Sequence, residues 1–152
     1  MLIATWFWVG LSPLAPGTCG SLAALPLAWA TRAISGAPGL AASLVVMFSA
    51  GIWAADAAAK ASEAQDPATI VVDEVAGQWL VLLAAPFDPV AWLFAFVLFR
   101  LFDIWKPWPV RWVDRHVKGG FGIMLDDILA AGYALLVLTV LWAIGGATGV
   151  RF

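Results

Sequence analysis

Five of the ten acidic residues in this 152-residue chain fall in three short segments surrounded by apolar residues. These acids are Asp73 and Glu74 in IVVDEVAGQW, Asp103 in FRLFDIWKP, and Asp126 and Asp127 in GIMLDDILAA. Ionisable side chains are costly in apolar surroundings, so their presence indicates a functional site. Carboxylates gathered at one place repel one another unless protons or a cation compensate them. Because oxygen ligands suit Mg²⁺, Mn²⁺ or Ca²⁺, and the chain has one His and one Cys, these segments predict a hard-cation site rather than a zinc site.

Basic residues accompany one of the acids. Arg100, Asp103 and Lys106 recur every three residues, on one face of a helix that Pro107 is expected to end. This spacing fits a local ladder of ion pairs as well as it fits a site for phosphate and metal.

A second anion-binding element is predicted near the amino terminus. The segment APGTCGS places Thr18, Gly20 and Ser21 before a helix expected at residues 21–34. A glycine-containing loop before a helix can direct backbone N–H groups at a phosphate. The alternative is a plain turn in which Thr18 or Ser21 caps the helix.

The acidic segments also have structural interpretations. Asp126 and Asp127 could be a pair stabilised at a helix N-terminus. Glu74 and Gln78 lie four residues apart on one helical face, so they could form a hydrogen-bonded pair within the protein. Three acidic segments in a chain with only 12% charged residues nevertheless favour a function.

The composition indicates where such a site would lie. The chain is 63% hydrophobic and 12% charged, whereas soluble domains are about 45–50% apolar and about 25% charged. A soluble globular protein is therefore not expected. The formal net charge of −2 argues against a nucleic-acid partner, and the length predicts a single domain over residues 1–152.

Long uncharged runs predict membrane helices. Residues 39–55 and 128–150 carry no charge and are expected to cross a bilayer as helices. Residues 1–31 are also uncharged, but three prolines interrupt them and no Lys or Arg precedes an apolar core. We therefore expect this segment to be retained rather than removed as a signal peptide.

Residues 75–99 are apolar except for Asp88. Pro86 and Pro89 flank this aspartate, and prolines break helices and favour turns. The sequence therefore predicts a helical hairpin with arms at about 75–85 and 90–104, which returns both polar ends to one face.

The distribution of basic residues predicts an orientation. Lys106, Arg111, Arg115 and Lys118 precede the last apolar run, whereas Arg151 alone follows it. By the positive-inside rule, residues 100–120 should face the cytoplasm. Ten Trp residues, several near segment ends, fit either an interfacial belt or ordinary packing.

Taken together, the motifs resemble those of the phosphatidylglycerophosphatase A family. The resembling segments are APGT at 15–18 with Gly20 and Ser21, Asp66-Pro67 leading into IVVDEVAGQ at 70–78, FRLFDIWKP at 99–107, and GIMLDD at 122–127. The resemblance runs from about residue 10 to 135. It implies an all-α membrane bundle around a central helix, and a multi-pass protein of the bacterial inner membrane. It also implies a Mg²⁺-dependent phosphatase that converts phosphatidylglycerophosphate to phosphatidylglycerol and inorganic phosphate.

The chemistry of phosphate monoester hydrolysis predicts roles for the acidic and basic residues of these motifs. A water activated by the metal is the expected nucleophile, with an aspartyl-phosphate intermediate as the alternative. The expected partners are the lipid substrate and membrane lipids. The expected catalytic and Mg²⁺-binding residues are Asp73, Glu74, Asp103, Asp126 and Asp127, and the expected phosphate-binding residues are Thr18, Gly20, Ser21, Arg100 and Lys106.

The rival hypothesis is a non-enzymatic membrane carrier with an ion-coupled acidic site. A carrier needs acids distributed across the depth of the membrane. A phosphatase needs them gathered at one face, beside Arg100 and Lys106.

Overall fold

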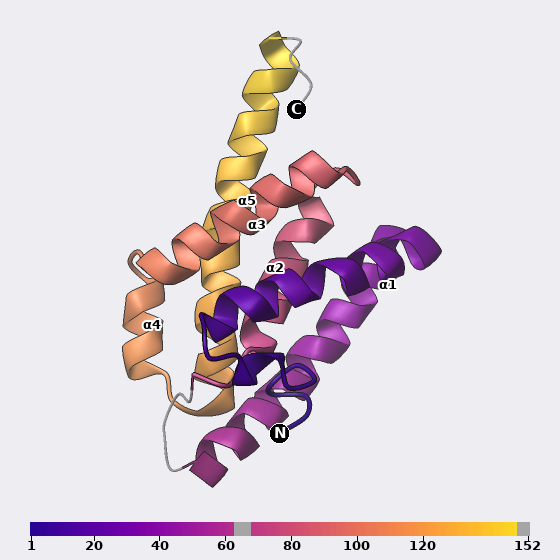
Figure 1. Ribbon diagram of the computed structural model, residues 1–152. Coiled ribbons are helices and arrows are strands. Elements are labelled where there is room, and N and C mark those ends of the chain that lie inside the picture. The colour runs from indigo at the N-terminus through magenta and orange to yellow at the C-terminus, as the bar shows by residue number, and fades with distance from the viewer. Residues whose placement is uncertain (63–67, 149–152) are drawn as a thin grey trace.

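The computed structural model describes residues 1–62 and 68–148, and over these residues the chain is helical, without strands (Figure 1). This confirms the predicted all-α class. Asp66 and Pro67 of the predicted motif lie outside the described residues. The elements are a short 3-10 helix η1 (Val9–Leu11), α1 (Pro16–Ser62), α2 (Val72–Ala84), α3 (Pro89–Trp105), α4 (Val110–His116) and α5 (Gly119–Thr148).

Helix α1 consists of two arms that reverse direction at Gly36, as Figure 1 shows. Gly36 has φ 67° and ψ −168°, a backbone conformation that glycine adopts without strain. The second arm contains the predicted helix at 39–55. The first arm begins at Pro16, so the expectation of a helix starting at residue 21 was wrong. Proline favours the first position of a helix, where its missing N–H is not needed.

The predicted hairpin is confirmed. Helices α2 and α3 are separated by residues 85–88, and Asp88 Oδ1 accepts hydrogen bonds from the backbone N–H groups of Val90 and Ala91 at 2.9 and 3.0 Å. Asp88 therefore caps α3. The other side of the turn is held by Arg32, whose Nη1 donates to the carbonyls of Leu82 and Ala85 at 2.6 and 2.7 Å.

Helix α2 lies at the centre of the bundle, between α1 and α5 (Figure 1). Its burial is extensive and includes the polar residues Asp73 and Gln78. Small residues permit its close packing: a Cβ on Gly77 would lie 3.1 Å from the backbone oxygen of Asp127 in α5. This close approach brings the acidic segments of α2 and α5 together.

Within the described residues, two helical spans are long and apolar enough to cross a membrane: Pro16–Ala61, which includes the reversal at Gly36, and Gly119–Ile144, with mean hydropathies of 1.6 and 2.0. Only 22% and 28% of their most apolar windows are buried inside the protein. The core helix of a soluble protein would bury most of such a surface. The outward-facing apolar side chains therefore indicate membrane association, as the composition predicted.

Candidate active site

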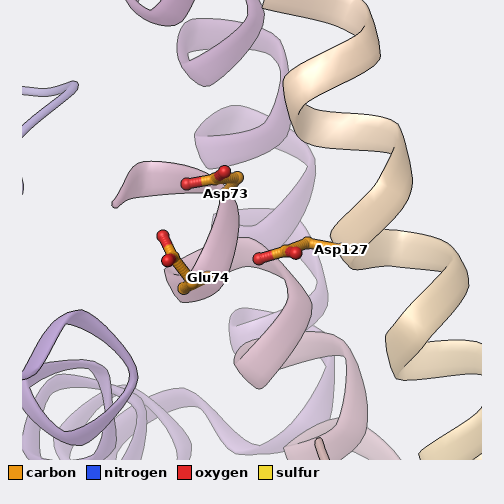
Figure 2. A group of neighbouring side chains, drawn as sticks. All are labelled: Asp73, Glu74 and Asp127. Atoms are coloured by element: carbon orange, nitrogen blue, oxygen red, sulfur yellow. The ribbon is translucent and has the colours of Figure 1, made fainter. Parts of the chain in front are cut away.

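Three of the predicted acids converge in the structure. Asp73 and Glu74 lie in the first turn of α2, and Asp127 lies in α5. Each offers one carboxylate oxygen, and these atoms lie within 4.8 Å of one another. Figure 2 shows the three carboxylates turned toward one space. Asp73 is 8% exposed and Asp127 is 3% exposed, so this acidic cluster is embedded in the bundle.

The local fold explains how the acidic cluster is held. The first turn of a helix presents unsatisfied N–H groups and the positive end of the helix dipole, which stabilise Asp73 and Glu74. Gly77, one turn later, leaves no side chain between α2 and α5. The carboxylate of Asp127 can therefore reach the start of α2.

Arg100 in α3 lies beside this cluster. Its Nη1 atom is 2.5 Å from Asp103 Oδ2 and 3.9 Å from Glu74 Oε1. The same atom donates a hydrogen bond of 3.4 Å to Ser21 Oγ in α1. The Asp103 carboxylate lies near enough to repel those of Glu74 and Asp127. Arg100 and Asp103, three residues apart on one helix, thus form an ion pair, as expected for a ladder. This ion pair lies beside the acidic cluster.

Lys106 occupies a different position from Arg100. Its Nζ atom lies 2.6 Å from Asp126 Oδ2 and 2.6 Å from Asp114 Oδ1, so it links α5 to α4. Burial works against the charged ammonium, but the carboxylates of Asp126 and Asp114 hold the pKa of Lys106 well above its usual value. Asp126 therefore faces Lys106, whereas its neighbour Asp127 faces the acidic cluster.

The amino-terminal motif forms the first turns of α1 rather than a loop. Ser21 Oγ donates to the carbonyl of Gly17 at 3.0 Å, so it does not cap the helix. Gly20 packs against α2, where an added Cβ would lie 2.8 Å from Val71 Cβ. Thr18 lies half-buried in the same turn. Of the three predicted phosphate-binding residues here, the structure brings Ser21 to the site, through Arg100.

Two residues at the site were not among the predicted ones. A Cβ on Gly17 would overlap Glu74 Oε1 and lie 3.2 Å from Arg100 Nη2, so the α1 backbone closes one side of the acidic cluster. Asp114 supplies the second carboxylate to Lys106. The proline–glycine pair at 16–17 could have indicated a position where the backbone makes a close contact. Nothing in the spacing of Asp114 indicated that its partner would be Lys106.

Several buried polar atoms at the site have no hydrogen-bond partner within the described ranges: Glu74 Oε2, Asp127 Oδ2 and both amide atoms of Gln78. Gln78 is fully buried, and neither of its amide atoms has a partner among the described residues, so the hydrogen-bonded Glu74–Gln78 pair that the sequence allowed is not formed. Buried polar groups are normally satisfied by protein, water or ions. Carboxylate oxygens from three residues within 4.8 Å of one another are a donor set that suits Mg²⁺.

The acids are gathered at one end of the α2–α3 hairpin. Asp73 and Glu74 begin α2, and Asp103 lies near the end of α3, whereas Asp88 caps the turn at the other end. A relay through the membrane would require acids at successive depths. The arrangement therefore favours a phosphatase over an ion-coupled carrier.

Comparisons with known proteins identify the family to which the chain is related. Residues 2–142 match the family Phosphatidylglycerophosphatase A. Phosphatidylglycerophosphatase A of Escherichia coli is 46% identical over 132 residues, covering 85% of this chain and 75% of that protein. The protein of the same name from Haemophilus influenzae is 39% identical over 138 residues, covering 90% and 85%.

A third relative carries a different name. A Bacteroides thetaiotaomicron protein, provisionally named phosphatidylinositol-3-phosphatase, is 44% identical over 164 residues and 95% of each chain is covered. No solved structure matches the chain significantly. The family match spans nearly the whole chain and confirms the relationship that the motifs predicted: the chain belongs to the phosphatidylglycerophosphatase A family, a family of lipid phosphatases.

Proposed function

We propose that this protein hydrolyses the terminal phosphate monoester of phosphatidylglycerophosphate, giving phosphatidylglycerol and inorganic phosphate, with Mg²⁺ as its cofactor. The observation that carries the proposal is the buried cluster of Asp73, Glu74 and Asp127, whose oxygens lie within 4.8 Å of one another beside Arg100. The names of the Escherichia coli and Haemophilus influenzae relatives supply the substrate.

The site residues have different roles in the proposed reaction. Asp73, Glu74 and Asp127 would hold Mg²⁺, with Asp103 and Asp126 at the edge of the site. When bound, Mg²⁺ supplies positive charge against the phosphoryl oxygens and acidifies water. Arg100 offers a planar, permanently charged guanidinium to the same oxygens, which suits a phosphate better than a point charge. Asp103 and Ser21 orient that guanidinium.

Lys106 has a positioning role in this scheme. Two carboxylates already engage its ammonium, at 2.6 Å each, and this holds Asp126 away from the acidic cluster. Three carboxylates rather than four therefore share the central space. Lys106 also places α4 against α5, and thereby shapes the entrance beside the site.

The membrane setting suits a lipid substrate. The outward-facing apolar surfaces of α1 and α5 would contact lipid, so the acyl chains of the substrate can stay in the bilayer while its head group reaches the acids. The excess of Lys and Arg between residues 106 and 118 supports an orientation with the site facing the cytoplasm. We propose the bacterial inner membrane as the location.

Phosphate release from the detergent-solubilised full chain tests the proposal. The substrate is phosphatidylglycerophosphate, with Mg²⁺ or with EDTA, and phosphatidylinositol 3-phosphate is assayed in parallel. The variants are Asp73→Asn and Asp127→Asn. Asp88→Asn is the matched control, because the same change is made at the far end of the hairpin and Asn is an equally good helix cap.

We expect Mg²⁺-dependent release by wild type and by Asp88→Asn, and a loss of about 100-fold or more in the two site variants. Turnover that is independent of metal, or unchanged rates in both site variants, would contradict the proposed site. If phosphatidylinositol 3-phosphate were hydrolysed faster than phosphatidylglycerophosphate, it would replace phosphatidylglycerophosphate as the proposed substrate.

A further inference from the structure

A hollow of about 480 Å³ lies beside α4, next to the proposed active site. Helix α4 packs against α5 (Figure 1). The residues that line the hollow come from the end of α3, the following connection and α4. Its lining is basic and aromatic: Lys106, Arg111, Arg115 and His116 with Trp105, Pro107, Trp108 and Trp112.

Two arginines give the pocket positive charge that no acidic residue within 1–62 and 68–148 neutralises through an ion pair. Arg111 Nη2 donates a 3.2 Å hydrogen bond to the carbonyl of Trp105, which leaves the rest of its guanidinium exposed. Arg115 is exposed and forms no ion pair with another described residue. Lys106, in contrast, is engaged by Asp114 and Asp126. Guanidinium groups bind phosphate through paired N–H donors.

Exposed indoles surround these charges. Trp105, Trp108 and Trp112 are 60%, 79% and 52% exposed. Tryptophan prefers the head-group layer of a bilayer, where its ring contacts apolar chains and its N–H contacts polar groups. The segment is held in place by Tyr133 of α5, whose hydroxyl donates to the carbonyl of Trp108 at 2.6 Å. These exposed indoles suit the head-group layer, which is also where lipid phosphates lie.

The pocket lies beside the proposed active site. Lys106 lines it and binds Asp126, the residue next to Asp127 of the acidic cluster. Arg115 lines both this pocket and a neighbouring hollow that Asp126 also lines. The pocket and the acidic cluster are thus linked through the adjacent residues Asp126 and Asp127.

We propose that this pocket binds the phosphodiester of the lipid, while the terminal phosphate monoester lies at the acidic cluster. The inference rests on the proposed function, because a glycerol unit separates these two phosphates in phosphatidylglycerophosphate. The indoles then direct the diacylglycerol part toward the bilayer. Such a pocket selects lipids with both groups over phosphatidic acid, which carries a monoester and no phosphodiester.

Binding of dihexanoyl phosphatidylglycerol tests the pocket without turnover, because this lipid has the phosphodiester and lacks the monoester. It is titrated into the solubilised full chain by calorimetry, with dihexanoylglycerol as the uncharged comparison. The variants are Arg115→Ala and the double variant Arg111→Ala/Arg115→Ala. Lys118→Ala is the matched control, since Lys118 is a nearby exposed cation that lines the neighbouring hollow but not this pocket.

We expect binding of dihexanoyl phosphatidylglycerol to weaken about tenfold in Arg115→Ala and further in the double variant, and to change less than twofold in Lys118→Ala. With phosphatidylglycerophosphate as substrate, KM should rise while kcat is largely kept. Equal binding by wild type and the double variant would overturn the proposal, as would an equal loss in Lys118→Ala.

Failure of the proposed function gives a different result. In that case wild type releases no phosphate from phosphatidylglycerophosphate, while the arginine variants still bind dihexanoyl phosphatidylglycerol more weakly than wild type. That result would support the pocket and contradict the proposed reaction. Arg115→Ala removes no hydrogen bond or ion pair that the structure shows, so its folding can be checked by an unchanged thermal midpoint.

Discussion

Replacing Gly17 with alanine tests how the acidic cluster is held, without removing any charged group. The added Cβ would overlap Glu74 Oε1 and lie 3.2 Å from Arg100 Nη2. Non-bonded heavy atoms prefer separations of about 3.5–4 Å, so the Glu74 carboxylate must move by roughly 1 Å or more. The Glu74 carboxylate lies at the end of a flexible side chain and can move without unfolding the bundle.

The expected effects on activity and stability differ widely. A displacement of about 1 Å at a reacting site can cost about 100-fold in rate. Alanine is also favoured over glycine within helices by about 0.5–1 kcal/mol, which offsets part of the steric cost. We therefore expect kcat/KM for phosphate release to fall about 100-fold, while the free energy of unfolding changes by only about 1 kcal/mol.

The assay is the initial rate of phosphate release from phosphatidylglycerophosphate, together with the thermal midpoint of the same sample. Gly132→Ala in α5 is the matched control, because no atom lies within 4 Å of the added Cβ there. It should retain wild-type activity. A folded Gly17→Ala variant with wild-type activity would refute the placement of Glu74 in the reacting site.

Three further predictions concern stability. Asp127→Asn removes one of three clustered charges, so its thermal midpoint in EDTA should equal or exceed that of wild type; a fall of several degrees would contradict this. Lys106→Met leaves Asp126 and Asp114 unpaired and should cost roughly 2 kcal/mol by thermal unfolding. Because the pKa of Lys106 is raised, the stabilisation that its ammonium supplies should be lost only as the pH rises past the ordinary lysine value of about 10.4. Arg32→Met loses two charge-assisted bonds at the far end of α2, so it should lower stability by roughly 2 kcal/mol with little loss of kcat/KM; a large fall in activity would refute the separation of the two ends.

Features determined by local sequence were predictable. The two prolines around Asp88 indicated the hairpin, and the spacing of Arg100 and Asp103 indicated their ion pair. Successive helical residues point about 100° apart, which is why Asp126 and Asp127 face different neighbours. Both acids were expected to bind the metal, and the structure turns Asp126 toward Lys106.

Features that depend on how distant helices meet were not predictable in this way. The contact of Gly17 with Glu74 requires the start of α1 to cross the start of α2, and no periodicity in either segment fixes that crossing. The same holds for Asp114, which reaches Lys106 only because α4 folds back beside α5. The helix start at Pro16 was missed for a different reason. The glycines suggested a loop, but they lie within the helix and let it pack closely against Glu74 and Val71.

Direct counting of bound metal tests the central claim, that Asp73, Glu74 and Asp127 form a divalent-cation site. Mn²⁺ is titrated into the solubilised full chain and the bound ions are counted by electron paramagnetic resonance, for wild type, Asp127→Asn and Asp88→Asn. We predict saturable Mn²⁺ binding by wild type and Asp88→Asn, displaced by excess Mg²⁺, and binding weakened at least tenfold in Asp127→Asn. Wild-type protein that binds no Mn²⁺, or Asp127→Asn protein that binds it as tightly as wild type, would contradict the account.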